Sequence, residues 1–369
     1  MSSPLTSPLK KAPSFWEKKG LLAYLLWPIA YLFGFISNLR RTAFELKILK
    51  SGKLPVPLII VGNIRVGGTG KTPVVIELAR QLVALGFHPG IISRGYTQSS
   101  KDNDKEVSDN ARAVTPFSDP SIDGDEPVLM ASALLDLNVP VWIGRDRLAC
   151  GNALIAAHPE CNVIISDDGL QHYKLARHPA REGGSDIEIV VRDGREDRNG
   201  FVLPAGPLRE SPNRPRDITL QNQATVLTPP YLANAPVFKV LAAVGYPYQL
   251  NHPEQRKPLA DFAGKLVLAS AGLGNPEKFF EILRTSGLTL KTLPLPDHFS
   301  FEVNPFDKDA FSGIDSILIT EKDAVKCQSL KDERIWVVPL RAQLPNEMLE
   351  CVKDGVPAML IDEARHINS

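Results

Sequence analysis

The feature that most constrains the fold is a glycine-rich loop between an expected strand and an expected helix. Residues 56–61 read VPLIIV, a short β-branched apolar run. Residues 74–86 read VVIELARQLVALG, with apolar residues at helical spacing and a final glycine as a stop signal. The loop between them closes with Gly70, Lys71 and Thr72. A strand, a glycine loop and a helix in this order predict a P-loop within a mostly parallel α/β sheet.

Each residue type in this loop suits phosphate binding. Glycines let backbone N–H groups turn toward phosphate oxygens, Lys71 carries charge to the β- and γ-phosphates, and the Thr72 hydroxyl can bind Mg²⁺. The loop departs from G-x-x-x-x-G-K-[ST] at the first glycine position, where Arg65 stands. The alternative is a fortuitous glycine-rich turn. The expected nucleotide-binding residues are Arg65, Val66, Gly67, Gly68, Thr69, Gly70, Lys71 and Thr72.

Two acidic residues follow a second apolar run. Residues 162–166 read NVIIS, and Asp167, Asp168 and Gly169 come next. Because α/β sheets bind ligands at the carboxyl ends of their strands, we expect Asp167 and Asp168 to hold Mg²⁺ together with Thr72. Asp168 is also a candidate catalytic group. The alternative is an Asp-Gly turn with solvated acids.

An uncharged segment precedes the P-loop. Residues 21–39 read LLAYLLWPIAYLFGFISNL, which is long enough for a transmembrane helix. Pro28 lies in its middle and basic pairs flank both ends, so a helix lying in one leaflet fits equally well. A signal peptide is disfavoured, because no clean cleavage site follows the segment and export would separate the nucleotide site from ATP. We expect a membrane-anchoring helix, with a buried helix hairpin as the alternative.

Charge is unevenly distributed along the 369 residues. The whole chain is balanced, with 42 basic and 42 acidic side chains, but residues 1–53 hold nine basic against two acidic ones. The acidic remainder argues against nucleic-acid binding, whereas the basic segment suits anionic lipid head groups. The four widely spaced cysteines indicate reduced thiols in a cytosolic compartment.

The length suggests two domains with an appendage. We expect a basic N-terminal segment at 1–53, whose anchoring helix covers 21–39. A P-loop α/β core should occupy 54–220. A second, smaller α/β domain at 221–369 should close the active-site cleft.

Six short motifs, in this order, closely resemble those of the tetraacyldisaccharide 4′-kinase family of lipid A biosynthesis. The resemblance covers roughly residues 20–340, and the ordered set is more specific than any one motif. The motifs are Val66-Gly67-Gly68-Thr69-Gly70-Lys71-Thr72-Pro73, Ser93-Arg94-Gly95-Tyr96, Gly124-Asp125-Glu126-Pro127, Asp167-Asp168-Gly169-Leu170-Gln171-His172-Tyr173, Gly206-Pro207-Leu208-Arg209-Glu210 and Thr320-Glu321-Lys322-Asp323-Ala324.

The resemblance implies a kinase that uses ATP and Mg²⁺. Its acceptor would be the 4′-hydroxyl of a tetraacylated glucosamine disaccharide 1-phosphate, and its product lipid IVA. The expected partners are this lipid and the membrane surface, with no nucleic acid and no obligate protein partner. The expected location is the cytoplasmic face of the inner membrane.

The resemblance also implies catalytic roles. Asp125 matches the catalytic aspartate of the family, and His298 would be the second member of a dyad in which a histidine orients a carboxylate. His172 would support the same site. Arg94 is expected at a sheet edge, where a phosphate contact and a structural ion pair are both open. Residues 178–185, HPAREGGS, are an insertion relative to the family pattern, expected as a surface loop that could disturb His172.

A rival interpretation is a membrane-recruited ATPase switch of the partitioning or ion-pump type, whose phosphate loop also reads G-G-x-G-K-[ST]. In those proteins a lysine normally precedes the two glycines, whereas Val66 stands there in this chain. A small-molecule kinase with an incidental anchor is a third interpretation, because acceptor pockets carry no short sequence code.

Overall fold

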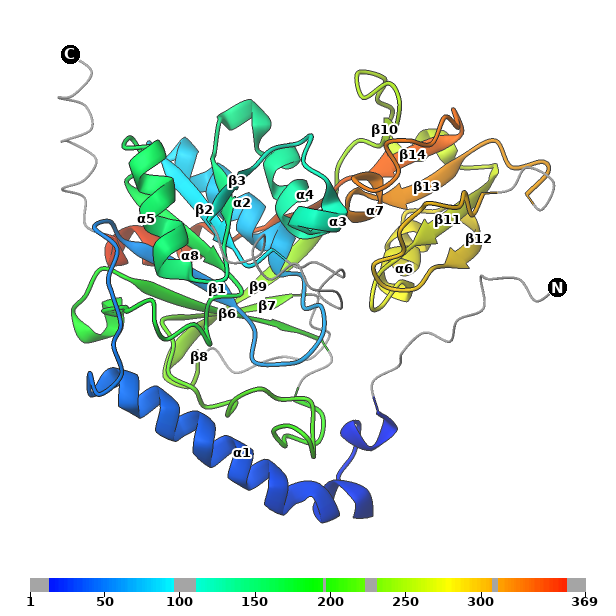
Figure 1. Ribbon diagram of the computed structural model, residues 1–369. Coiled ribbons are helices and arrows are strands. Elements are labelled where there is room, and N and C mark those ends of the chain that lie inside the picture. Colours follow the sequence, from blue (N-terminus) through cyan, green and yellow to red (C-terminus); the bar gives the residue numbers. More distant parts are fainter. Residues whose placement is uncertain (1–12, 96–110, 195–196, 223–230, 307–310, 357–369) are drawn as a thin grey trace.

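The computed structural model describes residues 13–95, 111–194, 197–222, 231–306 and 311–356. This part of the chain forms two separate sheets, each packed with its own helices. One long N-terminal helix lies outside both sheets (Figure 1). Tyr96, from the second family motif, lies outside the described residues, as do the basic residues Lys10 and Lys11.

The larger sheet has ten strands and a parallel centre. Its order is β15-β9-β7-β6-β1-β5-β2-β4-β3, and β8 pairs with β9 off this path. The expected strand before the P-loop is β1, which runs parallel to β5 on one side and to β6 on the other. The α/β fold with a P-loop core is thus confirmed. The strands are β1 (Leu58–Gly62), β2 (Pro89–Ser93), β3 (Arg112–Val114), β4 (Val141–Ile143), β5 (Val163–Asp167), β6 (Ile187–Asp193), β7 (Ile218–Asn222), β8 (Tyr231–Leu232), β9 (Ala235–Val244) and β15 (Leu340–Gln343).

Helices cover both faces of this sheet. Along β1, Ile59 and Val61 point into one apolar core and Leu58 and Ile60 into another, which explains why the strand has no polar face. The first core takes side chains from α2, α4 and α8, and the second takes them from α5. The helices and 3₁₀ turns of this unit are α2 (Lys71–Ala84), α3 (Pro120–Asp123), α4 (Asp125–Ala133), α5 (Arg147–Ala157), α8 (Asn346–Gly355), η3 (Leu135–Leu137) and η4 (Ala180–Glu182).

The smaller sheet has five strands in the order β10-β14-β13-β11-β12. It carries its own apolar cores on its two faces, so it is a separate packing unit. Its elements are β10 (Tyr248–Gln249), η5 (Leu259–Phe262), β11 (Leu266–Ala271), α6 (Glu277–Thr285), β12 (Thr289–Pro294), β13 (Ile317–Thr320), α7 (Glu321–Ala324) and β14 (Ile335–Val338).

The two units are not divided at residue 220, where the sequence pattern suggested a boundary. Strand β9 pairs in parallel with β7, so the large sheet continues past that point. The chain enters the small unit after β9 and returns as β15, which pairs antiparallel with β9. At the crossing, the Gly245 N–H donates to the Pro339 carbonyl at 2.9 Å. The small unit is therefore an insertion between two neighbouring strands of the large sheet.

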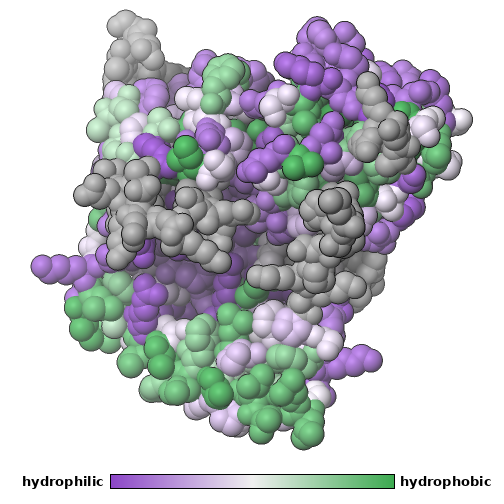
Figure 2. All heavy atoms as spheres, turned by 45° about the vertical axis from the view of Figure 1, so that its right-hand side comes forward, coloured by the Kyte–Doolittle hydropathy of each residue, from purple (hydrophilic) through white to green (hydrophobic). Residues whose placement is uncertain are grey.

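Helix α1 (Leu21–Glu45) follows the 3₁₀ turn η2 (Ser14–Trp16) and continues past the expected end at residue 39. Within the described residues it is the one helix long and apolar enough to cross a membrane, and only 11% of its most apolar window is buried. Ala23 and Ala30 are buried, and Tyr24 meets the Phe201 ring edge to face. This exposure contradicts the alternative of a buried helix hairpin, and the apolar side chains gather over α1 in Figure 2.

Candidate active site

The end of the P-loop is held by the strand β7. Gly70 precedes α2 with a φ of 83°, in the left-handed region that favours glycine. The Asn222 side chain, at the end of β7, donates to the Thr69 carbonyl at 3.3 Å. A Cβ at position 70 would collide with the Asn222 amide. The backbone conformation therefore requires glycine immediately before Lys71.

The beginning of the P-loop is held by backbone contacts with another segment. These contacts account for the departure of the loop from the usual P-loop pattern. Arg65 is buried and forms an isolated β-bridge with Leu208. The Val66 N–H donates to the Pro207 carbonyl at 2.9 Å, and the Asn63 side chain donates to the Gly67 carbonyl at 3.0 Å. Pairing with the 207–208 segment thus fixes the loop where a first glycine usually stands.

The lysine of the loop lies beside the second acidic motif. The Lys71 Nζ is 3.4 Å from Asp168 Oδ1, and the Arg209 Nη1 is 3.3 Å from Asp168 Oδ2. Burial raises the pKa of Asp168, but the charges of Lys71 and Arg209 outweigh it, so the pKa is lower than usual. The structure therefore brings an ionised Asp168 to Lys71 of the P-loop.

The neighbouring acid, Asp167, ends β5 and is buried. Its Oδ2 accepts a hydrogen bond from Ser93 Oγ at 3.1 Å, whereas its Oδ1 is buried without a hydrogen-bond partner. Burial, followed by the charge of Glu126, raises the pKa of Asp167 to about 6. An oxygen of this kind suits a hard cation.

The residues present fit Mg²⁺. Within the described ranges, no group of three or more His, Cys, Asp or Glu side chains is arranged so that it could hold a metal ion by itself. Mg²⁺ usually takes only one or two carboxylates and completes its octahedron with waters and substrate phosphates. Asp167, Asp168 and Thr72, the second residue of α2, supply such a partial set of oxygen ligands.

The structure brings Asp125 and His298 together from different units. Asp125 is the first residue of α4, and His298 follows β12 in the small unit. His298 Nδ1 is 3.0 Å from Asp125 Oδ2. His298 has a φ of 59°, which a non-glycine residue rarely adopts and which is typical of functional sites. The expected dyad therefore exists as a contact, although 173 residues separate its members.

Two lysines that the sequence analysis left without a role complete this carboxylate site. The Lys326 Nζ is 3.3 Å from Asp125 Oδ2 and 3.5 Å from Asp323 Oδ1. Burial raises the pKa of Asp125, but the hydrogen bond with His298 and the charges of Lys326 and Lys322 lower it to about 2. The sequence signal that could have indicated these lysines is the apolar run that forms β13, because charged residues follow directly at its carboxyl end.

Glu126 links this carboxylate site to the candidate metal ligands. It lies 3.5 Å from the Lys322 Nζ, and its charge also acts on Asp167. The candidate metal ligands and the Asp125 pair therefore belong to one charged region. Lys322 reaches the small-unit loop as well, through Asp297 at 3.7 Å.

His172 lies near Asp168 and two arginines. Its backbone N–H donates to the Gly169 carbonyl at 3.0 Å, in the turn after Asp168. Burial, then the charges of Arg147 and Arg94, lowers the pKa of His172 to about 4, so its imidazole is neutral near pH 7. Arg94 is exposed just after β2. The structure thus places His172 close enough to Arg94 and Asp168 for their charges to act on it.

The insertion at 178–185 lies at the surface. It forms a largely exposed turn around η4 whose base is held by Asp186. The Asp186 carboxylate accepts hydrogen bonds from the N–H of His178 at 2.7 Å and from that of Leu58 at 2.9 Å. The insertion is therefore fastened to the start of β1, as a surface loop.

Comparison with known proteins gives one consistent result. Residues 22–356 match the family described as tetraacyldisaccharide-1-P 4′-kinase. The tetraacyldisaccharide 4′-kinase of Polynucleobacter asymbioticus is 47% identical over 92% of this chain and 94% of its own. That of Herminiimonas arsenicoxydans is 46% identical over 91% and 92%. A crystal structure of the "apo" form of LpxK from Aquifex aeolicus in complex with ATP has a TM-score of 0.71 and 28% identity, covering 93% of this chain and 99% of that one.

Proposed function

The chain belongs to the tetraacyldisaccharide-1-P 4′-kinase family, and from that premise we propose which of its residues perform the reaction. It is an ATP-dependent kinase that transfers the γ-phosphoryl group to the 4′-hydroxyl of tetraacyldisaccharide 1-phosphate, forming lipid IVA in lipid A biosynthesis. The assignment of site residues is our proposal, and the contact between Asp125 and His298 beside the P-loop carries it.

Asp125 is the group we assign to the acceptor hydroxyl. Its carboxylate is ionised, so in the contact at Oδ2 His298 donates through Nδ1–H. His298 and Lys326 both contact Oδ2, which leaves Oδ1 to accept the hydrogen bond from the 4′-hydroxyl. As the hydroxyl oxygen bonds to the γ-phosphorus and the bond to ADP breaks, the hydroxyl proton passes to the Asp125–His298 pair.

The P-loop side holds the donor. Lys71 contacts the β- and γ-phosphates, and the backbone of residues 65–70 cradles them. Thr72, Asp167 and Asp168 would hold Mg²⁺, which neutralises charge on the phosphate oxygens. Arg209, already at Asp168, adds positive charge where the γ-phosphoryl group is transferred. His172, neutral near pH 7, donates a hydrogen bond to the same phosphates.

We further propose that α1 attaches the enzyme to the cytoplasmic face of the inner membrane. Its apolar surface is exposed along most of the helix, and Lys18, Lys19, Arg40 and Arg41 flank it. The acyl chains of the acceptor can then remain in the leaflet while the sugar reaches the site. No nucleic acid and no protein partner enters this proposal.

The division into units gives each a task. We propose a nucleotide-binding unit made of residues 54–244 and 340–355, and an inserted unit, 245–339, that brings His298 and Lys326 to Asp125. The ion pair between Lys278 of α6 and Asp193 at the end of β6, at 3.6 Å, also joins the two units.

The test is transfer of ³²P from γ-labelled ATP to purified tetraacyldisaccharide 1-phosphate in detergent micelles, with Lys71→Ala protein as the blank. We expect a more polar labelled lipid that depends on Mg²⁺. Hydrolysis of ATP without labelled lipid, rising with added membranes, would instead favour an ATPase switch. Equal labelling by the Lys71→Ala protein would contradict the P-loop assignment.

A further inference from the structure

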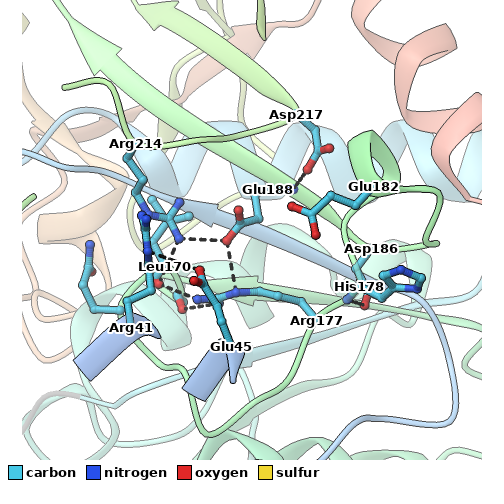
Figure 3. A network of polar contacts seen from close by, with 12 residues as sticks. Arg41, Glu45, Leu170, Arg177, His178, Glu182, Asp186, Glu188, Arg214 and Asp217 are labelled. Atoms are coloured by element: carbon cyan, nitrogen blue, oxygen red, sulfur yellow. Dashed lines mark hydrogen bonds and ion pairs between the residues drawn. The ribbon is translucent and has the colours of Figure 1, made fainter. Parts of the chain in front are cut away.

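A buried network of charges lies against the loop that carries Asp168 (Figure 3). Glu188 on β6 is at its centre, with its side chain only 3% exposed. Its Oε1 is 3.1 Å from Arg177 Nε and accepts a hydrogen bond from Arg214 Nη2 at 2.8 Å. Its Oε2 is 3.1 Å from Nη1 of a third arginine, Arg181. The three arginines come from two separate loops, so the network joins those loops to the large sheet.

Two of these arginines also donate hydrogen bonds to the backbone of the loop. Arg177 donates to the Gly169 carbonyl at 3.3 Å and to the Leu170 carbonyl at 2.8 Å. Arg214 donates to the Leu170 carbonyl at 3.3 Å. Both carbonyls come directly after Asp168, so the guanidinium groups fix the chain at the point where its carboxylate projects.

These contacts hold an uncommon backbone conformation at Asp168. Its φ is 49°, in the left-handed region, which aspartate adopts more readily than most residues with a Cβ but less readily than glycine. This conformation places its carboxylate within 3.4 Å of the Lys71 Nζ. Loss of the carbonyl contacts would let the backbone relax and turn the carboxylate away.

The far end of the loop is tied to the same network. The Gln171 side chain donates to Glu210 Oε1 at 2.7 Å, and Glu210 Oε2 is 2.7 Å from Arg214 Nε. Arg209, next to Glu210 in the chain, contacts Asp168. The loop is therefore held at its beginning, its middle and its end by one set of charged side chains.

Stability alone does not explain this arrangement. Buried ion pairs contribute little net stability, because desolvation offsets their attraction, and apolar residues of similar volume are often as stable. The planar guanidinium group of arginine does, however, fix the orientation of its partners, since it can bind a carboxylate and a carbonyl at defined angles. The network is suited to hold a backbone in place.

We propose that Arg177 and Arg214, joined by Glu188, are positioning residues that present Asp168 to the Mg²⁺ of bound Mg·ATP. This inference rests on the metal-binding role proposed for Asp168. Neither arginine touches the substrate; each acts through the Gly169 and Leu170 carbonyls. Residues that orient a ligand of a metal typically change metal affinity by about 10- to 100-fold when replaced.

The experiment measures binding of a fluorescent ATP analogue at increasing Mg²⁺, in the full-length protein without acceptor. Arg177→Lys keeps the positive charge but loses the planar guanidinium group. We expect half-maximal binding of the analogue to require about tenfold more Mg²⁺ than in the wild type. Binding of the analogue in EDTA should be unchanged. Arg214→Lys tests the same carbonyl contact if Arg177→Lys does not fold.

Arg181→Lys is the matched control. Arg181 binds the same carboxylate, Glu188, and pairs with Asp217 at 3.0 Å, and its described contacts do not include the loop carbonyls. This variant should keep the wild-type Mg²⁺ dependence even if its melting temperature falls. Equal effects of the two substitutions on Mg²⁺ affinity, or an effect of Arg177→Lys on melting temperature alone, would overturn the inference.

Asp168→Asn separates this inference from the function on which it rests. If Asp168→Asn weakens the Mg²⁺ dependence and Arg177→Lys does not, only the positioning role is wrong. If Asp168→Asn leaves the Mg²⁺ dependence unchanged, the assignment of Asp168 is wrong and the inference is overturned with it.

Discussion

At the scale of single residues, Asp125 acquires its properties from groups distant in the sequence. His298 and Lys326 both reach its Oδ2, and their combined effect, with that of Lys322, lowers its pKa to about 2 despite burial. A carboxylate with so low a pKa is ionised at neutral pH and can accept a hydrogen bond from a hydroxyl there. Its reactivity therefore depends on the small unit as much as on α4.

Loss of either dyad member should affect the chemical step. Asp125→Ala should lower kcat by more than about tenfold with little change in the KM for ATP, because the lost interaction is made in the transition state. His298→Ala should behave similarly, and the double variant should be no worse than the poorer single variant. Steady-state kinetics on the four proteins measures this, and full additivity would refute the dyad.

Lys326 should act through Asp125. Lys326→Met keeps much of the volume but removes the charge that faces the carboxylate, so kcat should fall while the KM for ATP stays near the wild-type value. Lys326→Arg should restore part of the rate. In an Asp125→Ala background, Lys326→Met should have little further effect; an undiminished effect there would show that Lys326 acts elsewhere.

At the scale of elements, strand ends and loops carry the site, and the sequence predicted these unevenly. β1, the P-loop and α2 could be read from residue types and periodicity, because their chemistry is local. The pairing of Asp125 with His298 came only from family resemblance, and Lys326 was missed. Such contacts depend on how two units meet, which short-range patterns do not encode.

The ion network on β6 should give the fold a defined dependence on pH. Burial raises the pKa of Glu188, but Arg177, Arg214 and Arg181 outweigh it, so the pKa is lowered in the folded state. The stability it contributes is thus present above the ordinary value of 4.5 and is lost as the pH falls below it. Urea unfolding should show Glu188→Gln about 3 kcal/mol less stable at pH 7, because arginines are left unpaired.

The difference between the wild type and Glu188→Gln should shrink as the pH falls below 4.5, because the unfolded wild-type chain then binds a proton at Glu188 while the folded chain still holds this carboxylate ionised. Measurements at pH 7, 5 and 4 check this dependence. A constant difference would contradict the assigned ionisation of Glu188.

Helix α1 should contribute attachment rather than fold stability. Leu25 and Leu32 are 71% and 56% exposed, so changing both to glutamine should release the protein from membranes without lowering its melting temperature. Leu135 and Leu241, which are 57% and 60% exposed elsewhere, provide a matched control when changed in the same way. Sedimentation with membrane vesicles measures the outcome, and equal release by both pairs would refute an anchoring role for α1.

At the scale of the whole molecule, one unit is inserted into the other. Residues 246–338 leave and re-enter the large sheet at adjacent positions, where Val244 pairs with Leu340. Asp125 and the P-loop remain in the large unit, whereas His298 and Lys326 lie in the insertion. Contacts between the two units should therefore be needed for transfer but not for nucleotide binding.

Replacing residues 246–338 by a short turn should leave a folded nucleotide-binding protein. Val244 and Leu340 would be changed to threonine, since both pack against the core of the small unit. We expect the fluorescent ATP analogue to bind and lipid phosphorylation to be absent. Full-length Lys71→Ala is the complementary control, because it keeps the small unit but loses the phosphate contact. Retained kinase activity in the shortened protein would contradict the proposed division.

The hydrogen bond between Gly245 and Pro339 has an evolutionary consequence. An insertion whose ends already meet can be gained in a single genetic event, without rethreading the surrounding sheet. On the division proposed above, the gene for such a protein is modular, because one part encodes the P-loop and an embedded segment encodes His298 and Lys326. On the proposed division, changes confined to the embedded segment alter the surroundings of Asp125 and leave the P-loop as it is.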